Sequence, residues 1–464
     1  MSDKRHLPVL ATPASSLRAD GHRNIVHPAD VHGRFTRARH VGFALLGAIF
    51  LAVPWIRIAG RPALFLDVPG RRFFLFGASY NAQDFWLAFF LASGMLFSLL
   101  FVTSVMGRVW CAWACPQTVF LEGVFRPIER LLEGPRNERM RRNAGPRGIS
   151  FWARKITKHA LFIVAASLVA HAFLAYFVSI PSLFVMVQRS PSEHATAFAW
   201  MVVVTALLYG NFAWFREQLC LVICPYGRLQ SILTDDDTMV VGYDARRGEP
   251  RGKGKNRQAH GSCVDCDRCV TVCPTGIDIR NGLQLDCIGC TQCIDACDEV
   301  MDKLKQPRGL VRWDSLRSLR GEGRRWLRPR VAVYVALGAL GATVAFFAMR
   351  SRAPFEANLV RMQGLPYVVT DDVVRNTFEL HVINKQDHEL TLELRAEAPV
   401  DVEVNMPSEI VLAPLENHPL VVVARGPRSA FGERARLTIV STSSGADPSD
   451  VDTARTSAAL LGPR

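Results

Sequence analysis

The stretch from Gly261 to Val300 constrains this chain most, because eight of its 12 cysteines lie there in two matched sets. The first set has the spacing C-x2-C-x2-C-x3-C, is followed by Pro274, and consists of Cys263, Cys266, Cys269 and Cys273. The second set repeats that spacing 24 positions later with Cys287, Cys290, Cys293 and Cys297. The stretch is therefore an internal duplication of a thiol-rich loop.

The spacing resembles that of bacterial ferredoxins, in which three thiolates hold one cubane and the fourth reaches the other cubane. It predicts two [4Fe–4S] clusters with crossed ligation. One cluster takes Cys263, Cys266, Cys269 and Cys297, and the other takes Cys287, Cys290, Cys293 and Cys273. Asp298 stands where the first set has Pro274. We expect that difference to change the local backbone and the potential of one cluster more than its ligation.

Two other readings of these cysteines explain less. A zinc site usually takes four ligands from two C-x2-C pairs, which does not account for two sets of three closely spaced thiols. A disulfide framework belongs to oxidising compartments, whereas the orientation argued below places this stretch in the cytoplasm.

Composition points to a membrane protein with basic loops. Hydrophobic residues make up 49% of the 464 residues, yet the formal net charge is +13. No segment alternates basic and aromatic residues on a plausible reading surface, so we expect no nucleic-acid partner. Residues 1–40 read as a basic cytoplasmic tail without the apolar core of a cleavable signal peptide. A solvated tail explains its irregularly spaced histidines better than a metal site does: His6, His22, His27, His32 and His40.

Five apolar segments are near the ~20 residues that span a bilayer. They cover residues 41–56, 85–106, a stretch within 160–182, 194–215 and 331–349. With the N-terminus inside, segments 1–40, 107–158 and 216–330 hold 38 of the 55 Lys and Arg. The positive-inside rule then places these segments in the cytoplasm and the C-terminus outside. The basic loop 107–158 is also expected to contact anionic lipid.

The chain therefore divides into a series of parts. We expect a tail at 1–40, a four-span core at 41–219, a cytoplasmic ferredoxin-like insert at 220–330 and a fifth helix at 331–349. Period-two runs such as Phe378, Leu380 and Val382 predict an immunoglobulin-like β-sandwich at 350–445. Residues 446–464, rich in Ser, Ala, Asp and Thr, are expected to be disordered.

A second cysteine system accounts for the remaining four thiols. Two C-x3-C-P motifs follow the second and fourth spans, and they contain Cys111, Cys115, Cys220 and Cys224. On a helix, positions i and i+4 share one face, and proline interrupts the helix directly afterwards. Soft thiolates favour Cu(I), and a close dithiol can also form a disulfide. The alternative is that these cysteines are buried small hydrophobic residues at helix ends, and the sequence leaves open whether all four meet.

Other polar residues in the spans are few. His171 lies inside the third span and His159 near its inner end. A haem would need an opposing ligand, so a hydrogen-bonded packing role for His171 explains the sequence better. Trp110 and Trp113 flank the first C-x3-C-P motif and are read as interface anchors.

In order and spacing, these motifs resemble the cytochrome c oxidase accessory family called CcoG, FixG or RdxA, from about Arg34 to Ser441. The resemblance implies a bacterial inner membrane protein that assists assembly of cbb-type oxidase by binding Cu(II) and reducing it to Cu(I). Cys111, Cys115, Cys220 and Cys224 would carry the copper. The implied partners are oxidase subunits or copper-delivery proteins and a cytoplasmic electron donor that the sequence does not identify. Whether the chain forms a homodimer is left open.

Two alternatives of other classes remain at this point. One is a quinol-linked electron-transfer subunit without a copper role, to which His171 or Arg57 could contribute. The other is a non-catalytic scaffold that grips oxidase subunits through its external β-domain. The chain has no GxGxxG or Walker loop, so we expect it to bind neither NAD, flavin nor ATP.

Overall fold

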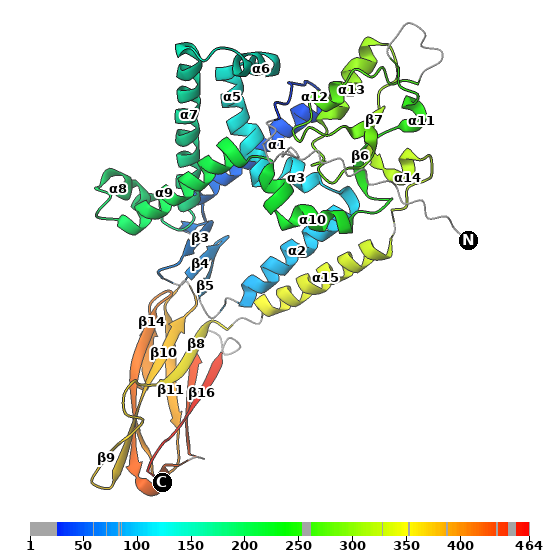
Figure 1. Ribbon diagram of the computed structural model, residues 1–464. Coiled ribbons are helices and arrows are strands. Elements are labelled where there is room, and N and C mark those ends of the chain that lie inside the picture. Colours follow the sequence, from blue (N-terminus) through cyan, green and yellow to red (C-terminus); the bar gives the residue numbers. More distant parts are fainter. Residues whose placement is uncertain are drawn as a thin grey trace. The chain divides into compact units, whose positions relative to one another are not determined.

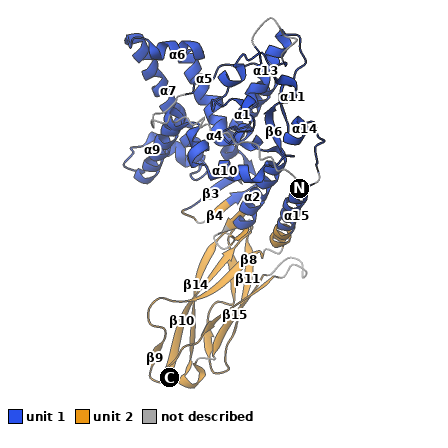
Figure 2. Cartoon of the chain, turned by 45° about the vertical axis from the view of Figure 1, so that its right-hand side comes forward, with its two compact units in different colours: residues 1–68, 74–77, 88–343 blue, residues 69–73, 78–87, 344–464 orange. Residues whose placement is uncertain are grey.

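The structure is a computed structural model. It describes residues 26–463 except 59, 71, 82–83, 85, 253–260, 327, 351–352, 387, 433–434 and 444–451. Two compact units form (Figures 1 and 2): residues 1–68, 74–77 and 88–343, called unit 1, and residues 69–73, 78–87 and 344–464, called unit 2. His6 and His22 lie outside the described residues.

Five helices are long and apolar enough to cross a membrane, in agreement with the five predicted spans. They cover Arg34–Trp55, Trp86–Met106, Ile149–Leu174, Ala195–Phe215 and Pro329–Arg350. In Figure 1 they are α1 (Arg34–Ala52), α2 (Trp86–Met106), α7 (Ile149–Leu174), α9 (Ala195–Gly210) and α15 (Pro329–Arg350). Large apolar side chains such as Leu45, Phe89 and Leu207 are at least 60% exposed on these helices, as lipid contact requires.

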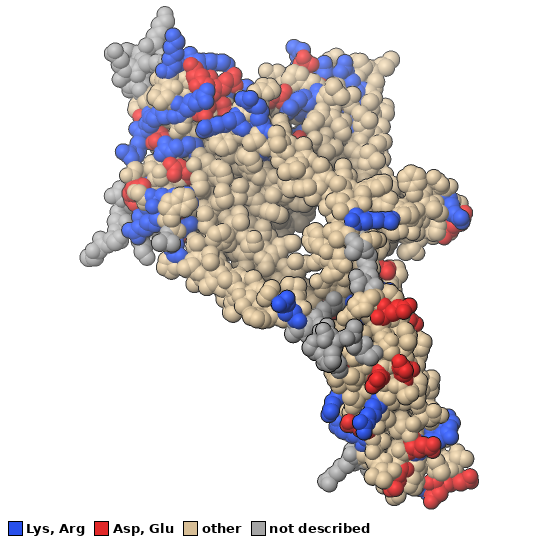
Figure 3. Space-filling view, turned by 180° about the vertical axis from the view of Figure 1, so that it is seen from behind, with Lys and Arg blue, Asp and Glu red and all other residues tan. Residues whose placement is uncertain are grey.

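Figure 3 shows a broad face of unit 1 that carries few charged side chains, with Lys and Arg gathered along its edge.

The connection between α1 and α2 contains short strands, and α8 follows α7. Their bounds are β1 (Arg57–Ile58), β2 (Arg61–Pro62), β3 (Leu64–Asp67), β4 (Arg72–Leu75), β5 (Ala78–Asn81) and α8 (Ile180–Gln188).

The third span lies earlier than the sequence predicts. α7 begins at Ile149 rather than near residue 160, so its first turns contain Lys155 and Lys158. Both ammonium groups lie 2.8 Å from a carboxylate oxygen of Glu133. Because Glu133 pairs with both lysines and Glu129 also lies 3.7 Å from Lys158, the helix can start among charges that apolar periodicity alone treats as a boundary.

Between α2 and α7 the chain makes a broken helical path. It consists of α3 (Val109–Trp113), α4 (Pro116–Phe120), the π-helix η3 (Leu121–Phe125), α5 (Arg126–Glu133) and α6 (Arg136–Ala144). After α9 it continues through two more π-helical segments and a short helix: η4 (Asn211–Phe215), η5 (Leu219–Ile223) and α10 (Pro225–Leu233). The aromatic rings of Phe125, Phe162 and Phe212 pack together where these paths meet α7. Wide π turns are common at functional sites, and here two of the three lie beside C-x3-C-P motifs.

The predicted insert folds around a two-stranded antiparallel sheet of β6 (Met239–Tyr243) and β7 (Val311–Ser315). Its helices are α11 (Ala245–Gly248), α12 (Arg268–Thr271), η7 (Ile279–Asn281), α13 (Gln292–Lys303) and α14 (Leu316–Leu319). Their apolar core includes Val241, Ile279, Ile294 and Met301, each no more than 3% exposed, together with cysteines of both sets. The thiols are therefore part of the core of this domain.

The N-terminal segment differs from the solvated tail expected for residues 1–40. α1 begins at Arg34, and residues 26–33 pack on the insert, where Ala29 donates a backbone hydrogen bond to Thr271. Val31 is buried against Val272 and Ala296. Asp295 of α13 accepts hydrogen bonds from the backbone N–H of Thr36 at 2.7 Å and from its hydroxyl at 2.8 Å. An acidic side chain at a helix N-terminus is electrostatically favourable, so α13 caps the first membrane helix.

Unit 2 contains the predicted immunoglobulin-like β-sandwich. One sheet has the order β12-β14-β10-β8, with β9 also paired to β10, and the other has the order β13-β11-β15-β16. The strands are β8 (Phe355–Arg361), β9 (Val368–Thr370), β10 (Val373–Asn384), β11 (Leu390–Glu397), β12 (Glu403–Asn405), β13 (Glu409–Leu412), β14 (Asn417–Pro427), β15 (Arg436–Ser443) and β16 (Thr453–Ala459). Phe378, Leu380 and Val382 are fully buried between the sheets, as their alternation predicts.

The prediction of a disordered tail at 446–464 is wrong for its second half. β16 pairs with β15 from Arg436↔Ala459 to Thr442↔Thr453, and Leu460 is fully buried. The strand escaped notice because its residues, TARTSAA, are small or polar and give no apolar alternation. Edge strands tolerate such composition because one side of the strand has no neighbouring strand to pack against.

Candidate iron–sulfur and thiol sites

The first set of cysteines surrounds a cavity in the insert. Cys263, Cys266, Cys269 and Cys297 line it, and Tyr243 and Arg280 contribute to its wall. Cys263 and Cys269 are buried, whereas Cys266 is exposed. The fourth cysteine comes from α13 and not from the loop that carries the other three.

A second cavity carries the other set. Its lining contains Cys273, Cys287, Cys290 and Cys293, and Cys269 of the first set also reaches it. The two cavities therefore share a wall. Cys273 lies close enough to Cys287, Cys290 and Cys293 for its charge, in addition to burial, to raise their pKa values. Cys263 and Cys266 are likewise close enough to Cys297 for their charges to raise its pKa. The structure thus groups the eight thiols as two crossed sets of four.

The chemistry of these thiols fits a metal cluster. Burial raises the pKa of Cys287 to about 11 and those of Cys290, Cys269 and Cys297 to about 12. Such thiols stay protonated at neutral pH unless a bound cation holds them as thiolates. Four thiols around each cavity supply the ligand set of one [4Fe–4S] cluster.

The cysteine loops are held in an unusual backbone conformation by charge. Asp265 and Asp267 have positive φ angles of 50° and 55°. Arg280 pairs with both carboxylates, at 2.7 Å and 2.6 Å, and with Asp278 at 2.7 Å. Its guanidinium is 7% exposed and lines the first cavity. Arg280 therefore fixes the loop of the first set, and no motif signalled it in the sequence.

Each C-x3-C-P motif places its two thiols differently from the prediction. Cys111 lies in α3, but Cys115 has extended backbone (φ −62°, ψ 127°) and is the N-cap of α4, whose first residue is Pro116. Cys224 (φ −68°, ψ 113°) is likewise the N-cap of α10. The expectation that both thiols share one helical face is therefore wrong. Proline fits the first position of a helix, because that position needs no N–H donor, so it starts a new helix here.

The four C-x3-C-P thiols are brought together. Cys220 is near enough to Cys115, Cys111 and Cys224 for their charges to raise its pKa, which burial and these charges bring to about 12. Burial likewise raises the pKa of Cys111 to about 11, partly offset by a hydrogen bond from Gln230 Nε2 at 3.2 Å. Across the described residues, no three His, Cys, Asp or Glu side chains are arranged to hold a single metal ion. The four thiols are thus neighbours without forming a ready-made site of three ligands.

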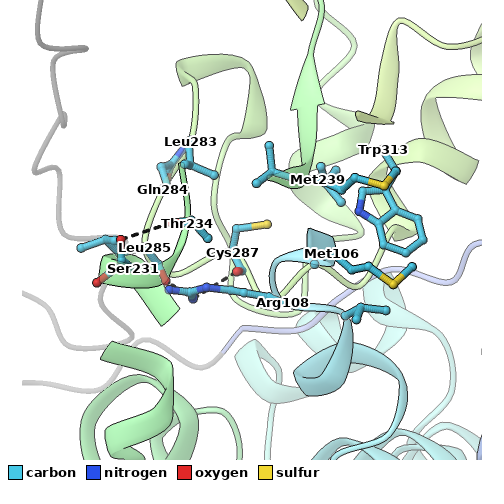
Figure 4. Close-up of a pocket in the computed structure, with 14 residues that line it drawn as sticks. Met106, Arg108, Ser231, Thr234, Met239, Leu283, Gln284, Leu285, Cys287 and Trp313 are labelled. Carbon is cyan, nitrogen blue, oxygen red and sulfur yellow. Dashed lines mark hydrogen bonds between the residues drawn. The ribbon is translucent and has the colours of Figure 1, made fainter. Parts of the chain in front are cut away.

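Arg108 joins the two cysteine systems (Figure 4). It stands three residues before Cys111, and its Nη1 donates to the carbonyl oxygens of Leu285 and, at 3.2 Å, Cys287. Its Nη2 donates to the carbonyl oxygen of Gly227, three residues after Cys224, at 3.1 Å. One guanidinium thus links both C-x3-C-P motifs to the loop of the second cluster set.

A small pocket lies at this junction, and Figure 4 shows Met106, Met239 and Trp313 on one side of it. Gly289 also lines it with φ +72°, and a Cβ there would meet the side chain and backbone of Arg108 at 3.5 Å. The positive φ is what favours glycine here, since a Cβ at 3.5 Å would make only an ordinary van der Waals contact. Sequence reasoning missed Arg108, since a single arginine beside a span reads as a topological signal.

Side-chain amide groups also connect the two C-x3-C-P motifs. Gln117, directly after Pro116, donates to the carbonyl oxygen of Arg216 at 2.9 Å and accepts from Asn211 Nδ2 at 2.6 Å. Arg216 has φ +53° and precedes Cys220 by four residues. The start of α4 is therefore bonded to the turn that leads into the second motif.

Glu129 of α5 holds that turn through charge. Its carboxylate accepts from Arg216 Nη2 at 2.9 Å and Nη1 at 3.1 Å, and it pairs with Arg139 at 3.2 Å. Lys158 lies 3.7 Å away. Burial alone would raise the pKa of Glu129, yet the charge and hydrogen bonds of Arg216, with Lys158 and Arg139, lower it to about 2.

Both histidines singled out in the third span have hydrogen-bond partners, whereas the two tryptophans are placed differently. His171 lies 2.7 Å from the carbonyl oxygen of Ser167 through Nδ1, and His159 Nδ1 lies 3.0 Å from the Tyr209 hydroxyl. Trp110 is 37% exposed. The buried Nε1 of Trp113 has no hydrogen-bond partner within the part of the chain that the structure describes.

Comparison with known proteins agrees with this architecture. A family model for a 4Fe-4S dicluster domain matches residues 215–316, and one for a 4Fe-4S binding domain matches residues 87–135. A third, described as an IG-like fold at the C-terminal of FixG, matches residues 345–463. With its five apolar helices, the chain is a membrane-bound iron–sulfur electron-transfer protein.

Full-length relatives define its family. Protein RdxB of Cereibacter sphaeroides is 33% identical over 455 residues, covering 92% of this chain and 94% of the relative. Nitrogen fixation protein FixG of Rhizobium meliloti is 33% identical, covering 81% of this chain and 79% of the relative. Protein RdxA of C. sphaeroides is 34% identical, covering 78% and 80%. The chain belongs to the FixG/RdxA family.

Crossed ligation can be tested with two serine variants. In Cys273→Ser we expect the second cluster to be lost preferentially, with about half of about eight irons per chain retained, because the first cavity keeps its four thiols. Cys297→Ser should show the reverse. Iron content and the EPR spectrum of each dithionite-reduced variant report the outcome. Equal loss of both clusters in both variants would contradict the grouping.

Removing the charge of Glu129 should destabilise unit 1. We expect Glu129→Gln to lower the free energy of unfolding by about 3–5 kcal/mol, because buried cations lose their partner. The stabilisation is present above the ordinary carboxyl pKa and is lost as pH falls toward the folded pKa of about 2. Denaturation midpoints of the purified protein measure the change. The control is Glu138→Gln, whose partly exposed pair with Arg142 should contribute less than about 1 kcal/mol; equal effects would argue against the network.

Proposed function

We propose that this protein binds Cu(II) at its C-x3-C-P thiols, reduces it to Cu(I), and thereby supplies copper for assembly of a cbb-type cytochrome c oxidase. The observation that carries the proposal is that four thiols gather beside the loop of the second cluster set: Cys111, Cys115, Cys220 and Cys224. Arg108 donates to a carbonyl oxygen of that loop and to one in the turn after Cys224. When bound, [4Fe–4S] clusters supply single electrons at potentials that can be strongly reducing.

The chain's own residues provide what a copper substrate needs. Reduction of Cu(II) to Cu(I) takes one electron and creates a soft ion that thiolates bind well. Cu(I) is satisfied by two thiolate ligands, so a pair from this group suffices without a preformed site of three. Burial keeps these thiols protonated until a metal displaces the proton, which disfavours their oxidation when copper is absent.

A second candidate function is favoured by one observation. The 4Fe-4S binding model that matches residues 87–135 covers only two cysteines, Cys111 and Cys115. A cubane needs four thiolates, and Cys220 and Cys224 are the neighbours that would complete them. In that case the four thiols would hold a third cluster instead of copper, and the protein would contain about twelve irons rather than about eight.

We propose that the N-terminus and the cysteine-rich insert face the cytoplasm of a bacterial inner membrane and that the β-sandwich lies in the periplasm. The distribution of Lys and Arg supports this orientation, because 38 of 55 lie in segments 1–40, 107–158 and 216–330. The sandwich is then free to contact oxidase subunits or copper-delivery proteins. Its outer face carries exposed Val360 and Val421 on either side of Glu379, which suits such a contact.

Copper reduction is tested on purified protein reduced with dithionite and then freed of excess reductant without oxygen. We expect added Cu(II) to lose its EPR signal while the cluster signals disappear. In a variant with all four C-x3-C-P cysteines changed to serine, the rate should fall at least about tenfold, since the thiolates that stabilise Cu(I) are gone. Iron content of that variant shows whether its clusters are intact.

The contrary outcomes are distinct. Clusters that remain reduced beside an unchanged Cu(II) signal would overturn the copper proposal. A serine variant that contains four fewer irons than the wild type would favour the third cluster. Undiminished copper reduction by an iron-replete serine variant would place the copper chemistry elsewhere.

The orientation has its own test. Protease added to intact spheroplasts should cleave the β-sandwich and spare the insert, because only the periplasmic side is accessible. Immunoblots against tags placed after residue 464 and within 253–260 would follow the two parts, with lysed cells as the control. Cleavage of the insert in intact spheroplasts would contradict the proposed topology.

A further inference from the structure

A groove of about 530 Å³ runs along the first membrane helix in unit 1. One wall is a single face of α1 from His40 to Leu51, and the other is formed by α4, η3 and the start of α5. Gln292, which lies between Cys290 and Cys293 in the sequence, lines it as well. The groove therefore reaches from a membrane helix to the loop of the second cluster set.

Small side chains create the groove. Ala44, Gly47 and Ala48 lie about one turn apart on the groove face of α1, and, apart from its chain neighbours and the nearby backbone of α1, no described atom lies within 4 Å of the place where a Cβ on Gly47 would be. The two walls meet at Gly123, whose Cβ would be 3.5 Å from that of Phe43. Gly123 belongs to the π-helical segment η3, where the wide turn changes the direction of the side chains.

The polar residues of the groove balance one another in charge. Glu122 pairs with Arg126 at 3.0 Å, and Arg130 pairs with Asp30 at 2.7 Å. His40 makes no hydrogen bond to any other residue that the structure describes, although it lines the groove. A site with paired charges and a free imidazole suits a neutral polar group that can hydrogen-bond. It does not suit a phosphate, which would require uncompensated cations.

This polar end lies next to cysteines of both systems. Arg39, adjacent to His40, is near enough to Cys290 for its charge to act on that thiol. Its Nε donates to the carbonyl oxygen of Ala112, beside Cys111, at 3.3 Å. Its Nη1 lies 3.2 Å from the terminal amide of the Gln292 side chain. The turn of α1 that carries the free imidazole is thus packed against both cysteine systems.

We propose that this groove binds a membrane quinol, with its ring at His40 and Glu122 and its isoprenoid tail along Ala44, Gly47 and Ala48. A quinol combines a neutral hydrogen-bonding ring with a lipid-soluble tail, which matches the two ends of the groove. Oxidation to the quinone breaks two O–H bonds and releases two electrons and two protons. Two one-electron clusters match the electrons, and His40, which is exposed to solvent, can accept each proton in turn and pass it to water. The inference rests on the iron–sulfur electron-transfer role and is independent of copper.

Photolabelling of the whole protein with its clusters, in nanodiscs, tests binding directly. The probe is an azido derivative of decylubiquinone, and labelled peptides are mapped by mass spectrometry. We expect label in α1 and in the α4–η3–α5 segment, with at least tenfold less when unlabelled decylubiquinone is in excess. Label elsewhere, or competition by phosphatidylglycerol in place of decylubiquinone, would overturn the proposal.

Matched variants tie the label to the groove. Gly47→Trp fills the space beside α1 and should reduce labelling at least tenfold, whereas Leu45→Trp, at a position 60% exposed outside the groove lining, should change it less than twofold. His40→Leu removes the free imidazole with little change in volume and keeps the test valid if the tryptophan variant does not fold. Undiminished labelling in His40→Leu and in a folded Gly47→Trp protein would contradict the site.

The labelling test of quinone binding does not depend on whether the protein reduces copper. Dithionite replaces the quinol as the source of electrons, so the groove variants should reduce copper normally after chemical reduction. Loss of labelling together with normal dithionite-driven copper reduction supports a quinone site that is separate from the copper chemistry. If the protein does not reduce copper at all, the labelling pattern still decides whether the groove binds quinone.

Discussion

One guanidinium group, that of Arg108, holds together segments that lie more than a hundred residues apart. It donates to carbonyl oxygens of the second cluster loop and of the turn after Cys224, while its own backbone leads into Cys111. Each carbonyl would lose a charged donor if the arginine were absent; two of these bonds are partly buried and the one to Leu285 is exposed, so each loss costs less than the ~1–3 kcal/mol of a fully buried acceptor. The position of the C-x3-C-P thiols relative to the second cluster loop therefore depends in part on this contact.

Networks of paired charges also stabilise other parts of unit 1. Arg280 pairs with three aspartates around the first cluster loop, and Glu129 pairs with cations from α6, α7 and the turn before Cys220. Removing charges from water is costly unless their partners are fixed in good geometry. The Glu129 network lies at the ends of two membrane helices, whereas the Arg280 network lies in the insert, and both hold irregular backbone near the thiols through paired charges.

Much of this architecture follows from periodicity and spacing, because each signal is local. The cysteine sets, the five apolar spans and the alternation at Phe378, Leu380 and Val382 each occupy a short stretch of sequence. What the sequence did not reveal depends on distant partners. The early start of α7 needs Glu133 to neutralise its lysines, and β16 needs β15 to give its small residues a place in the sheet.

The candidate site was likewise predictable from the sequence only where its signals are local. The crossed grouping of cysteines could be expected because the repeat fixes it, whereas the extended backbone at Cys115 and the role of Arg108 could not. Proline at position i+1 allows either a kink or a new helix, and only the packing of α4 against neighbouring segments decides between them. The groove along α1 was equally hidden, since it arises where two small-residue faces meet from separate parts of the chain.

The cap on the first membrane helix has a consequence for the order of synthesis. α1 enters the membrane early, but Asp295, which bonds to Thr36, is made 259 residues later. Until α13 has folded, the first turn of α1 lacks these acceptors. Because α13 also carries Cys293 and Cys297, folding of the cysteine-rich domain also supplies the acceptors for the first turn of α1, the membrane helix that is synthesised first. A ribosome-bound chain therefore holds its first helix unfinished until almost two thirds of the protein has emerged.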